Sequence, residues 1–66
     1  MKFPEILKTL RMEKGISQRQ LACDLQISIG LISYYETGKT EPTLTNIIKL
    51  ANYFKVSTDF LLGLEK

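Results

Sequence analysis

Apolar residues recur at three- and four-residue spacing along most of the chain, a period typical of amphipathic helices. In the first such segment, Pro4 suits the first position of a helix and Glu5 suits the positive end of the helix dipole. Gly15 can end the same helix. The pattern therefore predicts a first helix that begins about Pro4 and ends at Gly15, and the residues that recur at helical spacing are Phe3, Ile6, Leu7 and Leu10.

Two short helices follow, each opened by a serine. Ser17–Gln20 has the form of a capping box, with serine at the cap and glutamine three residues later, and the helix ends near Leu25. Ser28 is a second cap candidate and opens a helix to about Thr37, where Gly38 can take the left-handed conformation. The spacing predicts two helices joined by a tight turn.

The C-terminal part of the chain predicts two more helices. Residues 41–43 form a loop and a cap, and Ser57 with Asp59 starts a last helix that Gly63 stops. The apolar stripe of the fourth helix is Leu44, Ile47, Ile48, Leu50, Ala51 and Phe54, and the last helix carries Phe60, Leu61 and Leu62. The predicted fold class is all-α, a compact bundle of five short helices in one domain over residues 1–66.

Composition agrees with a soluble globular domain, because 44% of the 66 residues are hydrophobic and 24% are charged. No apolar run approaches the ~20 residues of a membrane helix, and the start lacks the apolar stretch of a signal peptide. We therefore expect a cytoplasmic protein with no membrane partner. The one cysteine, Cys23, cannot form an internal disulfide, and we expect a partly exposed bystander rather than a redox switch.

The chain contains no histidine, and we expect no metal site and no cofactor. No glycine-rich phosphate loop or nucleophile–base pair is visible, which argues against an enzyme. The net charge of +2 fits a nucleic-acid binder but does not decide the class. Within residues 17–40, Arg19 and Lys39 are balanced by Asp24 and Glu36.

A helical wheel divides the predicted third helix into two sides. We expect one side to pack against the domain; it holds Ser28, Ile32, Tyr35 and Glu36. The other side is small or polar and holds Gly30, Ser33, Tyr34 and Thr37. Ile29 and Leu31 lie on the flanks. The small or polar side suits a helix in a DNA major groove, and an ordinary solvated face is the alternative.

The register of these residues resembles the lambda-repressor-like (Cro and phage-repressor, XRE-type) helix-turn-helix DNA-binding family over nearly the whole chain. The matching positions are Ser17-Gln18, Leu21-Ala22, Leu25, Ile27-Ser28, Ile32-Ser33, Glu36, Gly38-Lys39, Glu41-Pro42, Leu44, Leu50-Ala51 and Val56-Ser57. The resemblance implies double-stranded DNA as the partner, with the second and third helices as the helix-turn-helix.

The resemblance also implies individual DNA contacts. Phosphate contacts fall to Ser17, Gln18, Thr37 and Lys39, and base contacts fall to Ser28, Ile29, Ser33 and Tyr34. Ser17 serves as a cap as well, and the alternative for Gln18 is an exposed polar residue without a DNA role. Many relatives carry Arg or Gln at the first groove-facing positions, where this chain has Ile29 and Gly30. We therefore expect sparse direct readout, with Ile29 against a thymine methyl, and reliance on DNA shape.

Two structural features come from the same resemblance. Arg11 and Glu36 match a pair that links the first helix to the end of the recognition helix, although two unrelated surface charges are the alternative. Gln26 and Lys55 stand where the family commonly has glycine, so both are expected to adopt left-handed backbone.

The leading functional hypothesis is a sequence-specific DNA-binding transcriptional regulator, with a repressor favoured over an activator. It would bind an inverted-repeat operator as a homodimer, with residues 28–37 in the major groove. The alternative is a protein-interaction module or antitoxin-like subunit, which apolar Ile29 and Leu31 favour slightly. The stretch Phe60–Leu64 either forms the subunit contact or closes the core. Tyr53 either packs, half-exposed, on the domain or joins a subunit contact.

Overall fold

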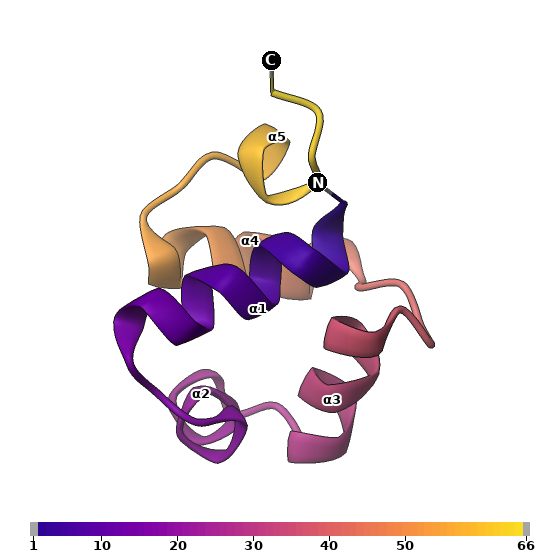
Figure 1. The fold of residues 1–66 in the computed structure, drawn as a ribbon. Helices are drawn as coiled ribbons and strands as arrows, with labels where there is room; N and C mark the ends of the chain where they lie inside the picture. Colours follow the sequence, from indigo (N-terminus) through magenta and orange to yellow (C-terminus); the bar gives the residue numbers. More distant parts are fainter. Residues whose placement is uncertain (1, 66) are drawn as a thin grey trace.

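The computed structural model describes residues 2–65, which form five helices and no strand. Figure 1 shows how these helices are arranged. Their bounds are α1 Phe3–Lys14, α2 Gln18–Leu25, α3 Ile29–Thr37, α4 Leu44–Phe54 and α5 Thr58–Leu61. Helix α1 crosses the middle of the molecule in Figure 1, with α5 above it and with α2 and α3 below it. The all-α prediction is confirmed.

Four of the five helices begin at a hydroxyl side chain that accepts a hydrogen bond from a backbone N–H three residues later. Ser17 Oγ accepts from Gln20 N at 3.0 Å, and Ser28, Thr43 and Ser57 accept in the same way at 3.1, 3.2 and 3.0 Å. All four predicted caps are confirmed. The capping box is only half formed, because the Gln20 amide donates to Asp24 Oδ1 at 2.7 Å.

Four helices end in a residue with left-handed backbone. Two of these residues are glycines, Gly15 at φ 75° and Gly38 at φ 78°, whereas Gln26 and Lys55 adopt φ 57° with a side chain present. The next N–H folds back onto the helix in each non-glycine case, as in the bond of 3.0 Å from Ile27 N to Ala22 O. The predicted backbone at Gln26 and Lys55 is confirmed.

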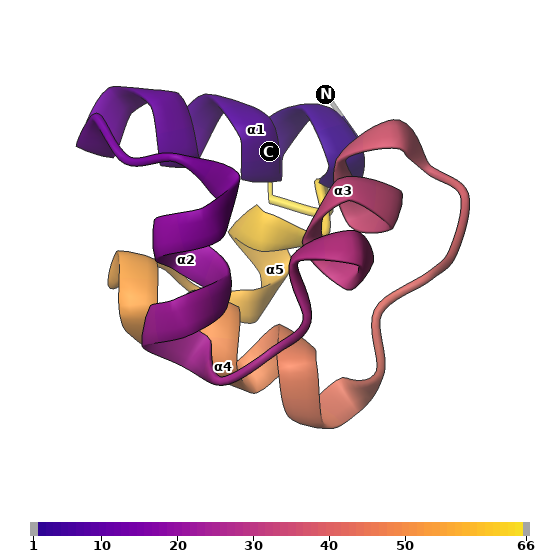
Figure 2. The same cartoon turned by 90° about the horizontal axis from the view of Figure 1, so that it is seen from below.

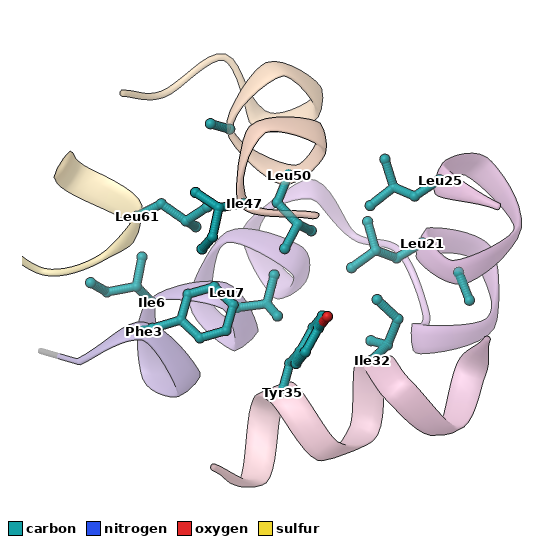
Figure 3. Close-up of a cluster of buried hydrophobic side chains, with 12 residues drawn as sticks. Phe3, Ile6, Leu7, Leu21, Leu25, Ile32, Tyr35, Ile47, Leu50 and Leu61 are labelled. Atoms are coloured by element: carbon teal, nitrogen blue, oxygen red, sulfur yellow. The ribbon is translucent and has the colours of Figure 1, made fainter. Parts of the chain in front are cut away.

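The buried side chains form one cluster to which all five helices contribute, shown in Figure 3. Its least exposed members are Leu7, Leu21, Ile32, Tyr35, Leu50 and Leu61. Tyr35 carries the only hydroxyl in this cluster, and that oxygen accepts a hydrogen bond of 2.9 Å from Asn46 Nδ2 on α4. The aromatic ring of Tyr35 also meets Phe3 edge to face, with 5.8 Å between centroids. Helix α3 is thereby fixed to α1 and α4.

Several apolar residues predicted to pack lie on the surface instead. Leu44 is 75% exposed and Ile48 is 46% exposed. The neighbouring helices therefore cover only part of the apolar side that the sequence predicts for α4. Phe54 is half-buried. Helix α5 ends at Leu61, before Leu62, and within Phe60–Leu64 only Leu61 is buried. Of the two alternatives for this stretch, core closure therefore rests on Leu61 alone, and the subunit contact stays a prediction.

A polar contact at the surface connects α2 to α4. The Tyr53 hydroxyl donates to Asp24 Oδ2 at 2.6 Å, and Lys14 Nζ lies 5.2 Å from the centroid of the Tyr53 ring. The hydrogen bond to Asp24 raises the pKa of Tyr53 to about 12. Tyr53 is half-buried and packs on the domain, and its part in a subunit contact stays a prediction. The neighbouring Cys23 is exposed, as expected for a bystander.

None of the helices within residues 2–65 has the length and apolar character needed to cross a membrane.

Replacing Gln26 by glycine is expected to raise the stability by about 1 kcal/mol, because the left-handed backbone at φ 57° strains a residue with a Cβ. Urea and thermal unfolding measure the change. The matched control is Lys8→Gly at an exposed position inside α1, which should lower stability by about 1 kcal/mol through the backbone entropy of glycine. A Gln26→Gly variant that unfolds more easily than the parent would contradict the strain at this turn.

Candidate nucleic-acid interface

Helices α2 and α3 form a pair joined by a short turn, seen from below in Figure 2. Left-handed Gln26 turns the chain out of α2, and Ser28 caps α3 two residues later. The turn is therefore only residues 26–28 long. Helix α3 also packs against α1, which leaves its remaining side open to solvent.

The inner side of α3 differs at two places from the wheel that the sequence predicts. Ile32 and Tyr35 are buried as expected, but Ser28 is exposed. Its backbone lies at φ −66° and ψ 146°, outside helical geometry, so a helical wheel does not apply to a cap residue. Leu31 is half-buried against the core instead of lying open on a flank, which removes part of the support for a protein-interaction surface.

The outer side of α3 carries few groups that can read a base. Ile29 is 43% exposed and Tyr34 is 50% exposed, while Ser33 is half-buried. A Cβ built on Gly30 would meet no atom within 4 Å, so packing within the fold does not require glycine there. The Thr37 hydroxyl donates to the carbonyl oxygen of Ser33 at 3.0 Å, so its proton is used inside the helix.

The structure brings together Arg11 and Glu36, the pair suggested by the family resemblance. Arg11 Nε donates to Glu36 Oε2 at 2.6 Å and Arg11 Nη2 donates to Glu36 Oε1 at 3.1 Å, a bidentate arrangement. The two side chains are 13% and 3% exposed. Hydrogen bonding to Glu36 raises the pKa of Arg11, against the opposing effect of burial. Arg11 Nη1 also donates to the Ile16 carbonyl oxygen at 2.9 Å.

Gln18, predicted as a phosphate contact, is a third member of this site through a bond to Glu36 that the sequence did not predict. Its Nε2 donates to Glu36 Oε1 at 3.1 Å, and the residue is half-buried rather than an exposed polar residue. One carboxylate on α3 thereby binds α1 through Arg11 and α2 through Gln18. Residues that lie 18 positions apart in sequence give no local signal of such a contact.

The phosphate candidates lie towards one end of α3. The bond between Gln18 and Glu36 places the start of α2 beside the C-terminal half of α3, and Ser17 is exposed next to it. Lys39 follows directly after the end of α3, with Nζ 5.6 Å from the centroid of the Tyr34 ring. The structure leaves Ser28 and Ile29 at the opposite end of this helix, about 13 Å away by the helical rise of its nine residues.

Comparison with known proteins assigns the chain to a family. A family model described as helix-turn-helix matches residues 7–61. The chain belongs to the helix-turn-helix family. It is 48% identical over 60 residues to YonR, an SPbeta prophage-derived HTH-type transcriptional regulator of Bacillus subtilis (strain 168), which covers 91% of this chain and 56% of that protein.

Two solved structures are similar over almost the entire chain. A transcriptional regulator from Listeria innocua has a TM-score of 0.90 at 35% identity, covering 98% of this chain and 61% of that one. The P22 c2 repressor in complex with synthetic operator 9T has a TM-score of 0.91 at 28% identity, covering 98% of both chains. The chain spans about half the length of the curated relatives it matches, as in the 56% and 50% covered of two Bacillus subtilis regulators.

Replacing Glu36 by alanine is expected to lower the free energy of unfolding by about 3 kcal/mol, because it leaves the largely buried Arg11 guanidinium without its carboxylate. Equilibrium unfolding in urea measures the loss. Glu41→Ala removes a carboxylate from an exposed loop position and should change stability by less than about 0.5 kcal/mol. Equal losses in the two variants would show that the buried pair has no special part in the fold.

Proposed function

We propose that the chain is a sequence-specific DNA-binding transcriptional regulator that inserts α3 into the major groove. The observation that carries this proposal is the similarity, at a TM-score of 0.91, to a repressor solved with its operator, covering 98% of both chains. The exposed outer side of α3 supports it, because a helix can enter the groove only where no other element covers it.

Side chains at and beside the C-terminal end of α3 would contact phosphates. Ser17 and Lys39 would contact phosphates, the first through the open N–H groups at the start of α2 and the second through its charge. Gln18 is already bonded to Glu36 through one N–H at 3.1 Å, and its second N–H is available to a phosphate oxygen. Thr37 is a weaker phosphate contact, since its hydroxyl proton is bonded within the helix.

Base reading would fall to the outer residues of α3, namely Ser28, Ile29, Ser33 and Tyr34. None of the four offers the two-point hydrogen bonding that arginine gives guanine or that glutamine gives adenine. Apolar contact of Ile29 with a thymine methyl and the shape of the DNA would therefore contribute much of the sequence preference.

We further propose that residues 1–66 act as one domain of a cytoplasmic repressor, with two copies on an inverted-repeat operator. One copy presents one short recognition helix, and specific binding by a module of this size usually requires a second half-site about one helical turn away. The proposal gives the chain a binding role and assigns it no metal, cofactor or catalytic step.

The first experiment measures binding of the chain to random double-stranded DNA by fluorescence anisotropy over a range of salt concentrations. Binding at low salt that falls steeply as salt rises supports a phosphate-contacting protein. Selection of bound sites from a random duplex pool should then give a symmetric sequence. Absence of binding at micromolar protein and low salt would refute the proposal and favour the protein-interaction alternative, for which exposed Ile29 is the remaining apolar contact.

Gly30→Glu is expected to abolish DNA binding while the domain stays folded, because the new carboxylate meets open space in the fold but faces phosphates in the complex. Thr58→Glu adds the same charge on α5, which lies on the other side of α1 from α3 in Figure 1, and should bind DNA normally. Circular dichroism checks that both variants are folded. Equal weakening by the two substitutions would place the DNA on a different face.

A further inference from the structure

The outer side of α3 leaves one residue with both length and a free hydrogen-bonding group. Ile29 is apolar, Gly30 has no side chain, and Thr37 uses its hydroxyl proton within the helix. Ser33 is half-buried and short, and Ser28 accepts from Leu31 N at the far end of the helix. Tyr34 is 50% exposed, and its phenol extends farther from the helix than any of these groups.

Lys39 contacts Tyr34 at both the backbone and the side chain. Its N–H donates to the Tyr34 carbonyl oxygen at 2.9 Å, a bond made possible by the left-handed turn at Gly38 with φ 78°. Its ammonium group lies 5.6 Å from the centroid of the Tyr34 ring. A lysine tethered by its backbone to the residue whose ring it covers restricts the orientations of that ring.

We propose that Tyr34 is a specificity-determining residue of α3, donating its phenol O–H to one acceptor on a base edge, and that Lys39 is a positioning residue that holds the ring in place. This inference rests on the proposed insertion of α3 into the major groove. It assigns Lys39 a function beyond contact with a phosphate, because its cation acts through the Tyr34 ring.

The chemistry of the pair defines which bases it selects. The Tyr34 hydroxyl is a better donor than acceptor, because one lone pair of a phenol oxygen is delocalised into the ring. Guanine O6 and N7, adenine N7 and thymine O4 are acceptors in the major groove, whereas cytosine presents only its N4 donor there. At the position that Tyr34 reads, the selected operator should therefore exclude cytosine on the contacted strand.

Selection of bound duplexes, followed by titration of the selected site and its single-base variants, tests the pair in four proteins: wild type, Tyr34→Phe, Lys39→Gln and Lys39→Arg. Tyr34→Phe should lower affinity about fivefold, the value of one net hydrogen bond, and remove the preference at one base pair. Lys39→Gln should weaken the preference at that same base pair, and Lys39→Arg should restore it, because a guanidinium also stacks on an aromatic ring.

The chain provides a matched control for the loss of charge. Lys14 lies over the Tyr53 ring at 5.2 Å, away from α3, so Lys14→Gln removes an equivalent lysine from an equivalent aromatic contact. It should leave every base preference unchanged. In the Tyr34→Phe background, Lys39→Gln should alter no base preference either, since the hydroxyl that Lys39 positions is absent.

Two results would overturn the proposal. If Lys39→Gln lowers only the salt dependence, by about one unit in the log–log slope, while all base preferences persist, Lys39 is a phosphate contact alone. If Tyr34→Phe retains every base preference, Tyr34 does not read the sequence. Either result leaves DNA binding intact, whereas failure of the proposed function would appear as no binding by the wild-type chain at low salt.

Discussion

The buried carboxylate of Glu36 fixes where the outer side of α3 lies relative to the rest of the molecule. At 3% exposure it requires partners, and it receives three hydrogen bonds, two from Arg11 on α1 and one from Gln18 on α2. The Glu36 carboxylate therefore sets the direction in which the exposed side of α3 faces. Burial of apolar side chains in the core supplies most of the stability. No buried side-chain nitrogen or oxygen within the described residues lacks a partner.

Helix α3 packs into the core with one side and leaves the other side in solvent. Ile32 and Tyr35 fill the interior, and the exposed Ile29 and Tyr34 are also largely apolar. On the inner side, the Tyr35 ring packs on Phe3 and the Tyr35 hydroxyl accepts a hydrogen bond from Asn46. Helix α3 is consequently anchored at successive turns to α1, α2 and α4 and leaves one side free for a partner.

Helix caps, which depend on residues close in sequence, could be predicted from the sequence. Burial and side-chain bonds between helices, which depend on residues far apart in sequence, were predicted less well. The caps at Ser17, Ser28 and Thr43 depend on an N–H three residues away, so local pattern was sufficient. The wheel failed for Ser28 because caps lie outside helical geometry, and the stripe of α4 failed at Leu44 because its covering depends on tertiary packing. The pairing of Arg11 with Glu36 was suggested by family register alone. The bond from Gln18 required the fold.

Gly30 has a consequence for how proteins with this fold can diverge. Nothing in the structure lies within 4 Å of a Cβ at this position, and the residue stands on the exposed side of α3. Because side chains can be exchanged there without repacking, one codon change could introduce a new donor or acceptor while the core stays as it is. Mutations at this position can then change the DNA sequence that is bound without changing the stability of the fold. Descendants of one gene could in this way come to control different promoters.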